Sequence, residues 1–232
     1  MKDNSNFDKI NEYYQENLEN VFARTEQALS GSRENNYKIL GWESREAQYK
    51  RFAVLAQNID LNGKSLLDVG AGLGDLYHFL TQGLHWSLEY VGTDILPEMV
   101  RMAEQQAVQI KLPDGVNASY KFLNTDIFDG KSNALKENRF DVVYTSGIFN
   151  LNLGNNEAFL KSAFEKFATI AGQYFACSLL SDESNDKEDA YFYYNEAVIE
   201  KAMTGVKKAN PSSEYRIIKG YLPNDMTVIW KR

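Results

Sequence analysis

The spacing of hydrophobic and polar positions differs between the first 60 residues and the rest of the chain. Up to residue 60 the apolar positions recur at helical spacing, which predicts helices over residues 7–29 and 45–59. From residue 64 onward, short apolar runs alternate with amphipathic segments. The predicted strands are 65–69, 88–94, 118–124, 139–147 and 173–181, and the predicted helices among them are 74–84, 97–110 and 156–171. Such an alternation favours a mostly parallel sheet with helices on both faces.

The pattern changes after residue 181. An acidic loop over 181–189 precedes a segment, 190–203, that we predict to be helical and that carries the aromatic run YFYYN. Four aromatic side chains in a row cannot all face the core from a helix, so we expect some of them to line a pocket. The pattern over residues 213–232 predicts two strands joined by a turn at LPND. These strands would complete the sheet as an antiparallel hairpin.

Composition narrows the classes of partner. The 232 residues favour one domain with at most a small cap, and an apolar content of 44% is enough for a core. Thirty-two acidic residues against 25 basic ones give a net charge of −7, and no basic run is longer than Lys207 and Lys208. Because a protein that neutralises phosphates needs a basic face, the sequence predicts no nucleic-acid partner.

The chain shows no sign of export or membrane insertion. Its first residues are polar and lack the apolar centre of a signal peptide, and no apolar run approaches membrane-spanning length. We therefore expect a cytoplasmic protein with no membrane partner. The single cysteine, Cys177, excludes a disulfide within the chain, and its apolar surroundings indicate a buried side chain rather than a nucleophile.

The stretch LLDVGAGLGDL joins a predicted strand to a predicted helix through Gly70, Gly72 and Gly74. A dinucleotide-binding turn would place its third glycine at position 75, where this chain has Asp75, a carboxylate at the helix N-terminus on which a pyrophosphate should sit. A P-loop would need Gly-Lys-Ser or Gly-Lys-Thr, which does not follow. The turn therefore suits a nucleoside without phosphates, and a nicotinamide-dependent oxidoreductase is a distant alternative.

This glycine turn, with Asp68 two residues before its first glycine, resembles motif I of the class I S-adenosylmethionine (SAM)-dependent methyltransferases. The chain is similar to that family over roughly residues 40–180 and, more loosely, in the C-terminal hairpin. The resemblance implies an α/β fold with a Rossmann-like, doubly wound sheet of seven strands, mostly parallel with a C-terminal antiparallel hairpin, plus an N-terminal helical cap. It also implies SAM as the cofactor.

The resemblance assigns roles to residues at the ends of successive strands. Asp94, which ends the second strand, would bind the ribose hydroxyls, and Asp126, after the third strand, would face the adenine amino group. Asp68 would help to hold the methionine ammonium group. The fourth strand ends in Ser146, which would lie beside the sulfonium that carries the methyl group.

A closer resemblance concerns two flanking segments. GWESREAQYKRF (41–52) and SGIFNL (146–151) are similar to segments of small bacterial and archaeal methyltransferases whose substrate is unassigned. In those proteins the first segment folds over the cofactor, which makes Trp42 and Gln48 candidates to contact the methionine end. Packing within the cap is an equal alternative for Trp42. The cofactor-binding residues that the resemblance predicts are Trp42, Gln48, Asp68, Gly70, Ala71, Gly72, Gly74, Asp94, Ile95, Asp126, Ile127 and Ser146.

The same reasoning divides the chain into two parts. Residues 1–60 are predicted to form the helical cap, and residues 61–232 the methyltransferase domain, with a lid insertion near 182–205.

Absent motifs restrict the acceptor. The segment from Ser146 to Asn150 lacks the Asn/Asp-Pro-Pro-aromatic motif of nucleic-acid amino methyltransferases and the Pro-Cys pair of cytosine enzymes. The metal-dependent catechol enzymes have an acid where Ser146 stands, so no metal is expected. His78 and His85 are the only histidines, and both should lie away from the methyl group.

Methyl transfer from a sulfonium is an in-line displacement, in which positioning and desolvation supply much of the catalysis. A small-molecule acceptor that is methylated at nitrogen or oxygen rather than carbon is therefore favoured, with Asn150 and Tyr193 as its predicted contacts. Two alternatives stay open: a protein side chain or terminus as acceptor, and a module that binds SAM without turnover. The oligomeric state is open as well.

Overall fold

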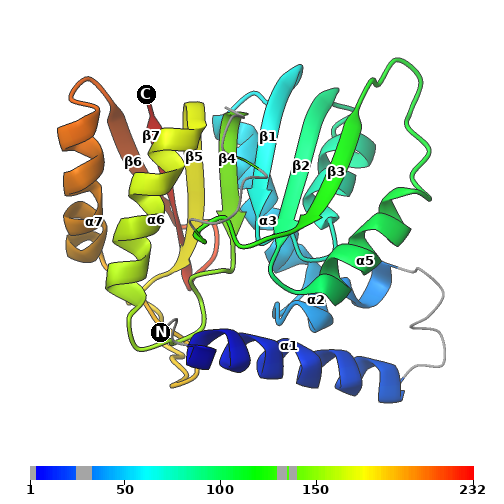
Figure 1. Ribbon diagram of the computed structural model, residues 1–232, viewed down its shortest axis with the longest axis horizontal. Helices are drawn as coiled ribbons and strands as arrows, with labels where there is room; N and C mark the ends of the chain where they lie inside the picture. The colour runs from blue at the N-terminus through cyan, green and yellow to red at the C-terminus, as the bar shows by residue number, and fades with distance from the viewer. Residues whose placement is uncertain (1–3, 25–32, 130–134, 136–139) are drawn as a thin grey trace.

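The computed structural model is built on a seven-stranded sheet in the order β3-β2-β1-β4-β5-β7-β6 (Figure 1). It describes residues 4–24, 33–129, 135 and 140–232. The strands are β1 (Lys64–Val69), β2 (Leu88–Asp94), β3 (Ser119–Asn124), β4 (Phe140–Ser146), β5 (Ala171–Leu180), β6 (Glu214–Lys219) and β7 (Asp225–Lys231). Strands β1 to β5 pair in parallel, and β7 runs antiparallel to both β5 and β6. The predicted fold class is thereby confirmed.

Helices connect the strands and cover both faces of the sheet (Figure 1). They are α1 (Asn4–Arg24), the 3-10 turn η2 (Arg33–Asn35), α2 (Asn36–Ile39), α3 (Arg45–Asn58), α4 (Asp75–His78), the π-helical turn η3 (Phe79–Gly83), α5 (Pro97–Ala107), α6 (Asn156–Ile170) and α7 (Glu196–Ala209). None of the described helices is long and apolar enough to cross a membrane.

Alternate residues of the central strands feed two cores, one on each face of the sheet. On β1, Leu67 belongs to the core that contains Phe164 of α6, whereas Leu66 belongs to the core that contains Phe52 of α3. Because both faces are covered, the centres of the strands carry consecutive apolar residues, Leu66 and Leu67 in β1 and Val142, Val143 and Tyr144 in β4, which is typical of buried parallel strands.

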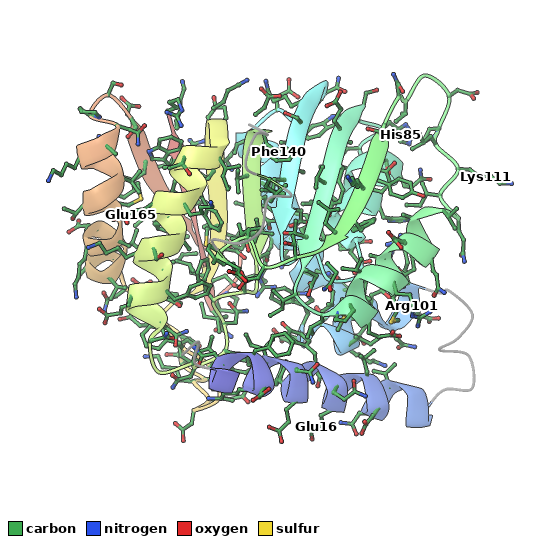
Figure 2. All side chains as sticks on the ribbon, in the orientation of Figure 1. Glu16, His85, Arg101, Lys111, Phe140 and Glu165 are labelled. Carbon is green, nitrogen blue, oxygen red and sulfur yellow. The ribbon has the colours of Figure 1, made fainter. Side chains whose placement is uncertain are left out.

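Helix α1 lies across the edge of the sheet where the parallel strands end (Figure 1). Leu18 and Val21 pack there in a cluster with Leu73 and Leu96, which follow β1 and β2. Glu16 extends from the face of α1 that is turned away from the sheet (Figure 2). The helix therefore covers the edge at which open α/β sheets bind ligands.

The predicted helix over 190–203 starts too early. Tyr191 and Tyr194 form isolated β-bridges instead, and α7 begins only at Glu196. The side chain of Asn195 accepts a hydrogen bond from the N–H group of Val198 and caps the helix. The aromatic run is therefore extended chain. The last part of the helix predicted over 7–29 lies outside the described residues, as does position 139.

Candidate functional site

A cavity of about 670 Å³ lies at the carboxyl ends of β1, β2 and β4. It brings together all but one of the residues predicted to bind the cofactor. Those that line it are Trp42, Gln48, Asp68, Gly70, Ala71, Gly72, Asp94, Ile95, Asp126, Ile127 and Ser146. Gly74 does not line the cavity and serves instead as the residue before α4, with φ of 73°. We call this space the first cavity.

The glycine turn brings bare backbone up to its neighbours. A Cβ at Gly70 would lie 2.2 Å from the Ile148 side chain, and one at Gly72 would lie 2.6 Å from Leu40. Both glycines also have positive φ, 73° and 53°, which other residues rarely adopt. The N–H groups of Gly70 and Ala71 donate to the Thr93 carbonyl of β2 at 2.8 and 2.9 Å. The turn is thus fastened to the strand that carries Asp94.

Asp94 is held from two sides. Its Oδ2 atom accepts from the Gly72 N–H group at 3.0 Å, and its Oδ1 atom accepts from the Leu96 N–H group at 3.0 Å. Burial raises the pKa of Asp94, and these backbone donors oppose the shift. A carboxylate fixed in this way keeps lone pairs for two further donors, such as the neighbouring hydroxyl groups of a ribose.

Asp68 is buried in the floor of the first cavity and accepts a hydrogen bond of 2.5 Å from the Tyr90 hydroxyl group. Burial raises the pKa of Asp68 to about 7, the Tyr90 hydrogen bond opposes the rise, and the charges of Asp94 and Asp75 add to it. Such a carboxyl group is ionised most easily when a cation lies against it. An ammonium group in the cavity would meet this requirement.

Asp75, the residue after Gly74, links the glycine turn to the segments before β1. Its Oδ1 atom accepts from Arg33 at 3.1 Å and from Asn36 at 2.7 Å, and its Oδ2 atom accepts from Gln48 at 3.2 Å. Asp75 is 3% exposed and also lines the first cavity. The network therefore fixes Gln48 at the cavity wall.

The loops after β2 and β3 supply an apolar part of the wall with a polar edge. Ile95 and Ile127 line it, and Asp126 is exposed at its rim, where its Oδ1 atom accepts from the Phe128 N–H group at 2.9 Å. An apolar wall with a carboxylate at its rim suits a planar base that carries an amino group.

The end of β4 offers hydroxyl groups. The Ser146 and Ser178 hydroxyl groups share a hydrogen bond of 2.6 Å, and Ser146 lines the first cavity together with Tyr144. Burial raises the pKa of Tyr144, so this phenol stays protonated.

A second cavity of about 710 Å³ lies beside the first, and Trp42 lines both. The predicted acceptor contacts Asn150 and Tyr193 line this second cavity and are not in the wall of the first. Trp42 closes against Gly147, where a Cβ would lie 3.2 Å from the edge of the indole ring. The indole is therefore part of the partition between the two spaces.

Neither histidine lines either cavity. His85 is exposed and lies toward the edge of the sheet opposite α1 (Figure 2). His78 belongs to α4, and burial lowers its pKa. Within the described part of the chain, no three His, Cys, Asp or Glu side chains gather as a metal site would need.

Sequence reasoning missed several residues that shape the site. Tyr90 holds Asp68, Tyr14 of α1 lines the first cavity, and Arg33 and Asn36 hold Asp75. The last two partners stand 42 and 39 positions from Asp75, and no local pattern joins them. For Tyr14, the sequence predicts only that it lies in a helix, over residues 7–29, and not that it lines the site.

Comparisons with known proteins show the family and the fold of this chain. A family model described as "Methyltransferase domain" matches residues 60–216. No curated protein matches the chain. Among solved structures, magnesium protoporphyrin IX methyltransferase (ChlM) from Synechocystis PCC 6803, with bound SAM, is 16% identical, with a TM-score of 0.56 over 85% of this chain and 82% of that one.

Two further structures are similar. A SAM-dependent methyltransferase from Methanosarcina mazei is 12% identical, with a TM-score of 0.58 over 77% of this chain and 96% of that one. The methyltransferase domain of bacterial CtHen1 is 17% identical, with a TM-score of 0.57 over 80% of this chain and 99% of that one. At these identities the similarity concerns the fold.

Proposed function

The chain belongs to the methyltransferase-domain family and is a class I SAM-dependent enzyme, and from this premise we propose that it methylates a small molecule at nitrogen or oxygen. The first cavity is the proposed cofactor site. The acceptor is proposed to approach from the side of Ser146 and Trp42, where the second cavity adjoins the first.

The residues of the first cavity fit SAM part by part. A space of about 670 Å³ is within the ordinary range for a nucleotide-sized ligand. In the proposed arrangement Asp94 accepts from the ribose hydroxyl groups, and Asp126 and Ile127 face the adenine. Asp68 and Gln48 lie at the methionine end.

Once bound, SAM supplies an electrophilic methyl group on a positively charged sulfur. The protein's own part is to bind, orient and exclude water. Asp68 balances the ammonium group of the methionine moiety, and the glycine turn allows the backbone to approach without a Cβ in between. Ser146 and Tyr144 offer neutral oxygens near the proposed position of the sulfur, and a site with few mobile waters favours in-line displacement.

The observation that carries the small-molecule assignment is the cover over the first cavity. Phe7, Ile10 and Tyr14 of α1 line it, so the helix lies over the site rather than leaving an open groove. A long polymer would need such a groove. The net charge of −7 also disfavours RNA. A protein acceptor is the second candidate, because the exposed Phe7 side chain offers an apolar contact beside the site.

The experiment is a methyl-transfer assay with SAM labelled in its methyl group. The protein is incubated in parallel with metabolites below about 1 kDa, with a denatured protein fraction and with total RNA. We expect label in the small-molecule pool alone. Label that enters protein or RNA, and does so less when Asp94 is replaced by alanine, would contradict the proposed acceptor and leave the enzyme class intact.

A further inference from the structure

We propose that the second cavity is the acceptor site and that the acceptor is a small amine, attracted as a cation and methylated at nitrogen. This inference rests on the proposed function and names the substrate class for it.

The partition is a fixed part of the structure. The Arg51 guanidinium group lies 4.4 Å from the centre of the Trp42 ring and forms a two-point ion pair with Asp225, at 3.0 and 2.5 Å. Asp225 is the first residue of β7, so the indole is tied to the sheet. Because Arg51 is 7% exposed and Asp225 4%, solvent screens this pair little. The two cavities therefore adjoin along a wall whose position is fixed.

The second cavity is rich in aromatic rings. Tyr13 and Tyr191 share a hydrogen bond of 2.9 Å between their hydroxyl groups, and both line the cavity together with Tyr193 and Trp42. Aromatic faces attract organic cations. Tyr193 is held in place because its hydroxyl group accepts from the Glu188 N–H group at 3.0 Å.

The charge around the second cavity is acidic. Glu43, Asp186 and Glu188 line it, and all three are exposed. Among the described residues of the lining, Lys38 is the cation that remains once Arg51 is paired with Asp225, and Lys187 also lies 6.0 Å from the Tyr193 ring. A predominantly acidic opening raises the local concentration of cations and repels anions such as phosphates.

The lining also offers polar residues to an acceptor. Asn150 and Asn224 line the cavity and are partly exposed, whereas the unpartnered Nη1 atom of Arg51 is itself buried within the described part of the chain. An oxygen on the acceptor would find hydrogen-bond partners at the asparagines. The expected ligand is therefore an amine that carries an oxygen function elsewhere.

Methylation of an amine needs no general base from the protein, and neither cavity wall contains a histidine. An amine that loses its proton to water offers a nitrogen lone pair, which forms the new N–C bond while the sulfur keeps the electron pair of the broken S–C bond. Any remaining excess proton leaves the methylated nitrogen for solvent. An alcohol would need a general base at this point, and an amine does not.

The test measures binding in the presence of saturating S-adenosylhomocysteine (SAH), with three probes that share one ring and one phenol. They are tyramine, which is cationic, tyrosol, which is neutral, and 3-(4-hydroxyphenyl)propanoate, which is anionic. We expect tyramine to bind at least about tenfold more tightly than either of the others, and to lose this advantage as salt is raised.

Two variants and a control sharpen the result. Asp186→Asn/Glu188→Gln should weaken tyramine about three- to tenfold and leave tyrosol and SAH unchanged. Tyr191→Leu, which removes a ring that lines the second cavity and not the first, should weaken tyramine about three- to tenfold and leave SAH binding unchanged. The control Glu46→Gln changes an exposed acid of α3 that lines neither cavity, and it should change nothing.

If SAH binds but tyramine binds no better than tyrosol or not at all, the amine assignment is overturned and the proposed function stands. If SAH itself does not bind, the proposed function fails and this inference fails with it.

Discussion

Individual carboxyl groups in the first cavity differ in how they are held, and these differences predict different behaviour. Asp94 is fixed by two backbone N–H groups, whereas Asp68 has a tyrosine hydroxyl as its partner and a pKa raised to about 7. Asp126 is exposed. The three residues should therefore respond differently to substitution and to pH.

Asp68 makes cofactor binding depend on pH. Because its pKa is raised in the free protein, Asp68 is largely protonated at pH 6, and the incoming ammonium group must displace that proton. The affinity for SAH should fall about fivefold from pH 7.5 to pH 6, and binding should release a proton at pH 6. Above about pH 8 the ammonium group itself begins to lose its charge, so the affinity should fall again.

Calorimetry in buffers of different ionisation enthalpy measures both effects. Asp68→Asn, which cannot ionise, should bind SAH weakly and without proton release on the acid side. The free energy of unfolding of the unliganded protein should change in the opposite direction to the SAH affinity. It should fall as the pH rises through the raised pKa of Asp68. An SAH affinity that stays constant or improves toward pH 6 would refute the assigned role of Asp68.

At the scale of elements, the Asp75 network joins α4 to η2, α2 and α3. Asp75→Asn should lower the free energy of unfolding by about 2–4 kcal/mol, because Arg33 is left as a charge that is only 12% exposed. It should also weaken SAH binding about tenfold through Gln48. Chemical denaturation and calorimetry measure the two effects.

The matched control for Asp75→Asn is Glu98→Gln, which removes the ion pair of Glu98 and Arg101 on α5. These side chains are 43% and 52% exposed, so Glu98→Gln should cost less than about 0.5 kcal/mol. Gln48→Ala should weaken SAH binding less in the Asp75→Asn protein than in the wild type, because Gln48 has already lost its anchor. Fully additive effects on SAH binding would show that Asp75 stabilises the fold without positioning Gln48.

Elements with strong local patterns could be predicted from the sequence. The predicted strand over 118–124 and helix over 97–110 differ from β3 and α5 only at their ends, because their apolar positions match one period throughout. The start of α7 was misplaced because Tyr191 and Tyr194 pair with distant segments, and such pairings outweigh local preference.

Part of the candidate site could be predicted, because the order of the motifs along the chain already determines which residues meet. The glycine turn and the acids that end strands gather at one edge of any such sheet, so their meeting follows from topology. The Asp75 network and the partition at Trp42 depend on contacts between residues far apart in sequence, such as Arg51 with Asp225. Neither has a local signature.

At the scale of the whole molecule, the rate at which Cys177 reacts with a thiol reagent measures global unfolding. It is fully buried in β5 within the main core, and burial raises its pKa well above the ordinary value. A thiol reagent should therefore label the native protein only through unfolding. SAH at about 100 times its Kd should slow this labelling about 100-fold. Fast labelling at a rate that does not depend on SAH would show that β5 unfolds locally, and would contradict the burial of Cys177 described above.

The most direct measurement for the account as a whole is a calorimetric titration with SAM, SAH and NADH of the wild type, Asp94→Ala and the control Asp60→Ala, which changes an exposed acid outside the first cavity. We expect SAM and SAH to bind with micromolar Kd, Asp94→Ala to weaken both about 100-fold, and Asp60→Ala to have no effect. NADH should not bind. Binding of NADH, or SAM binding that does not depend on Asp94, would contradict the assignment of the first cavity.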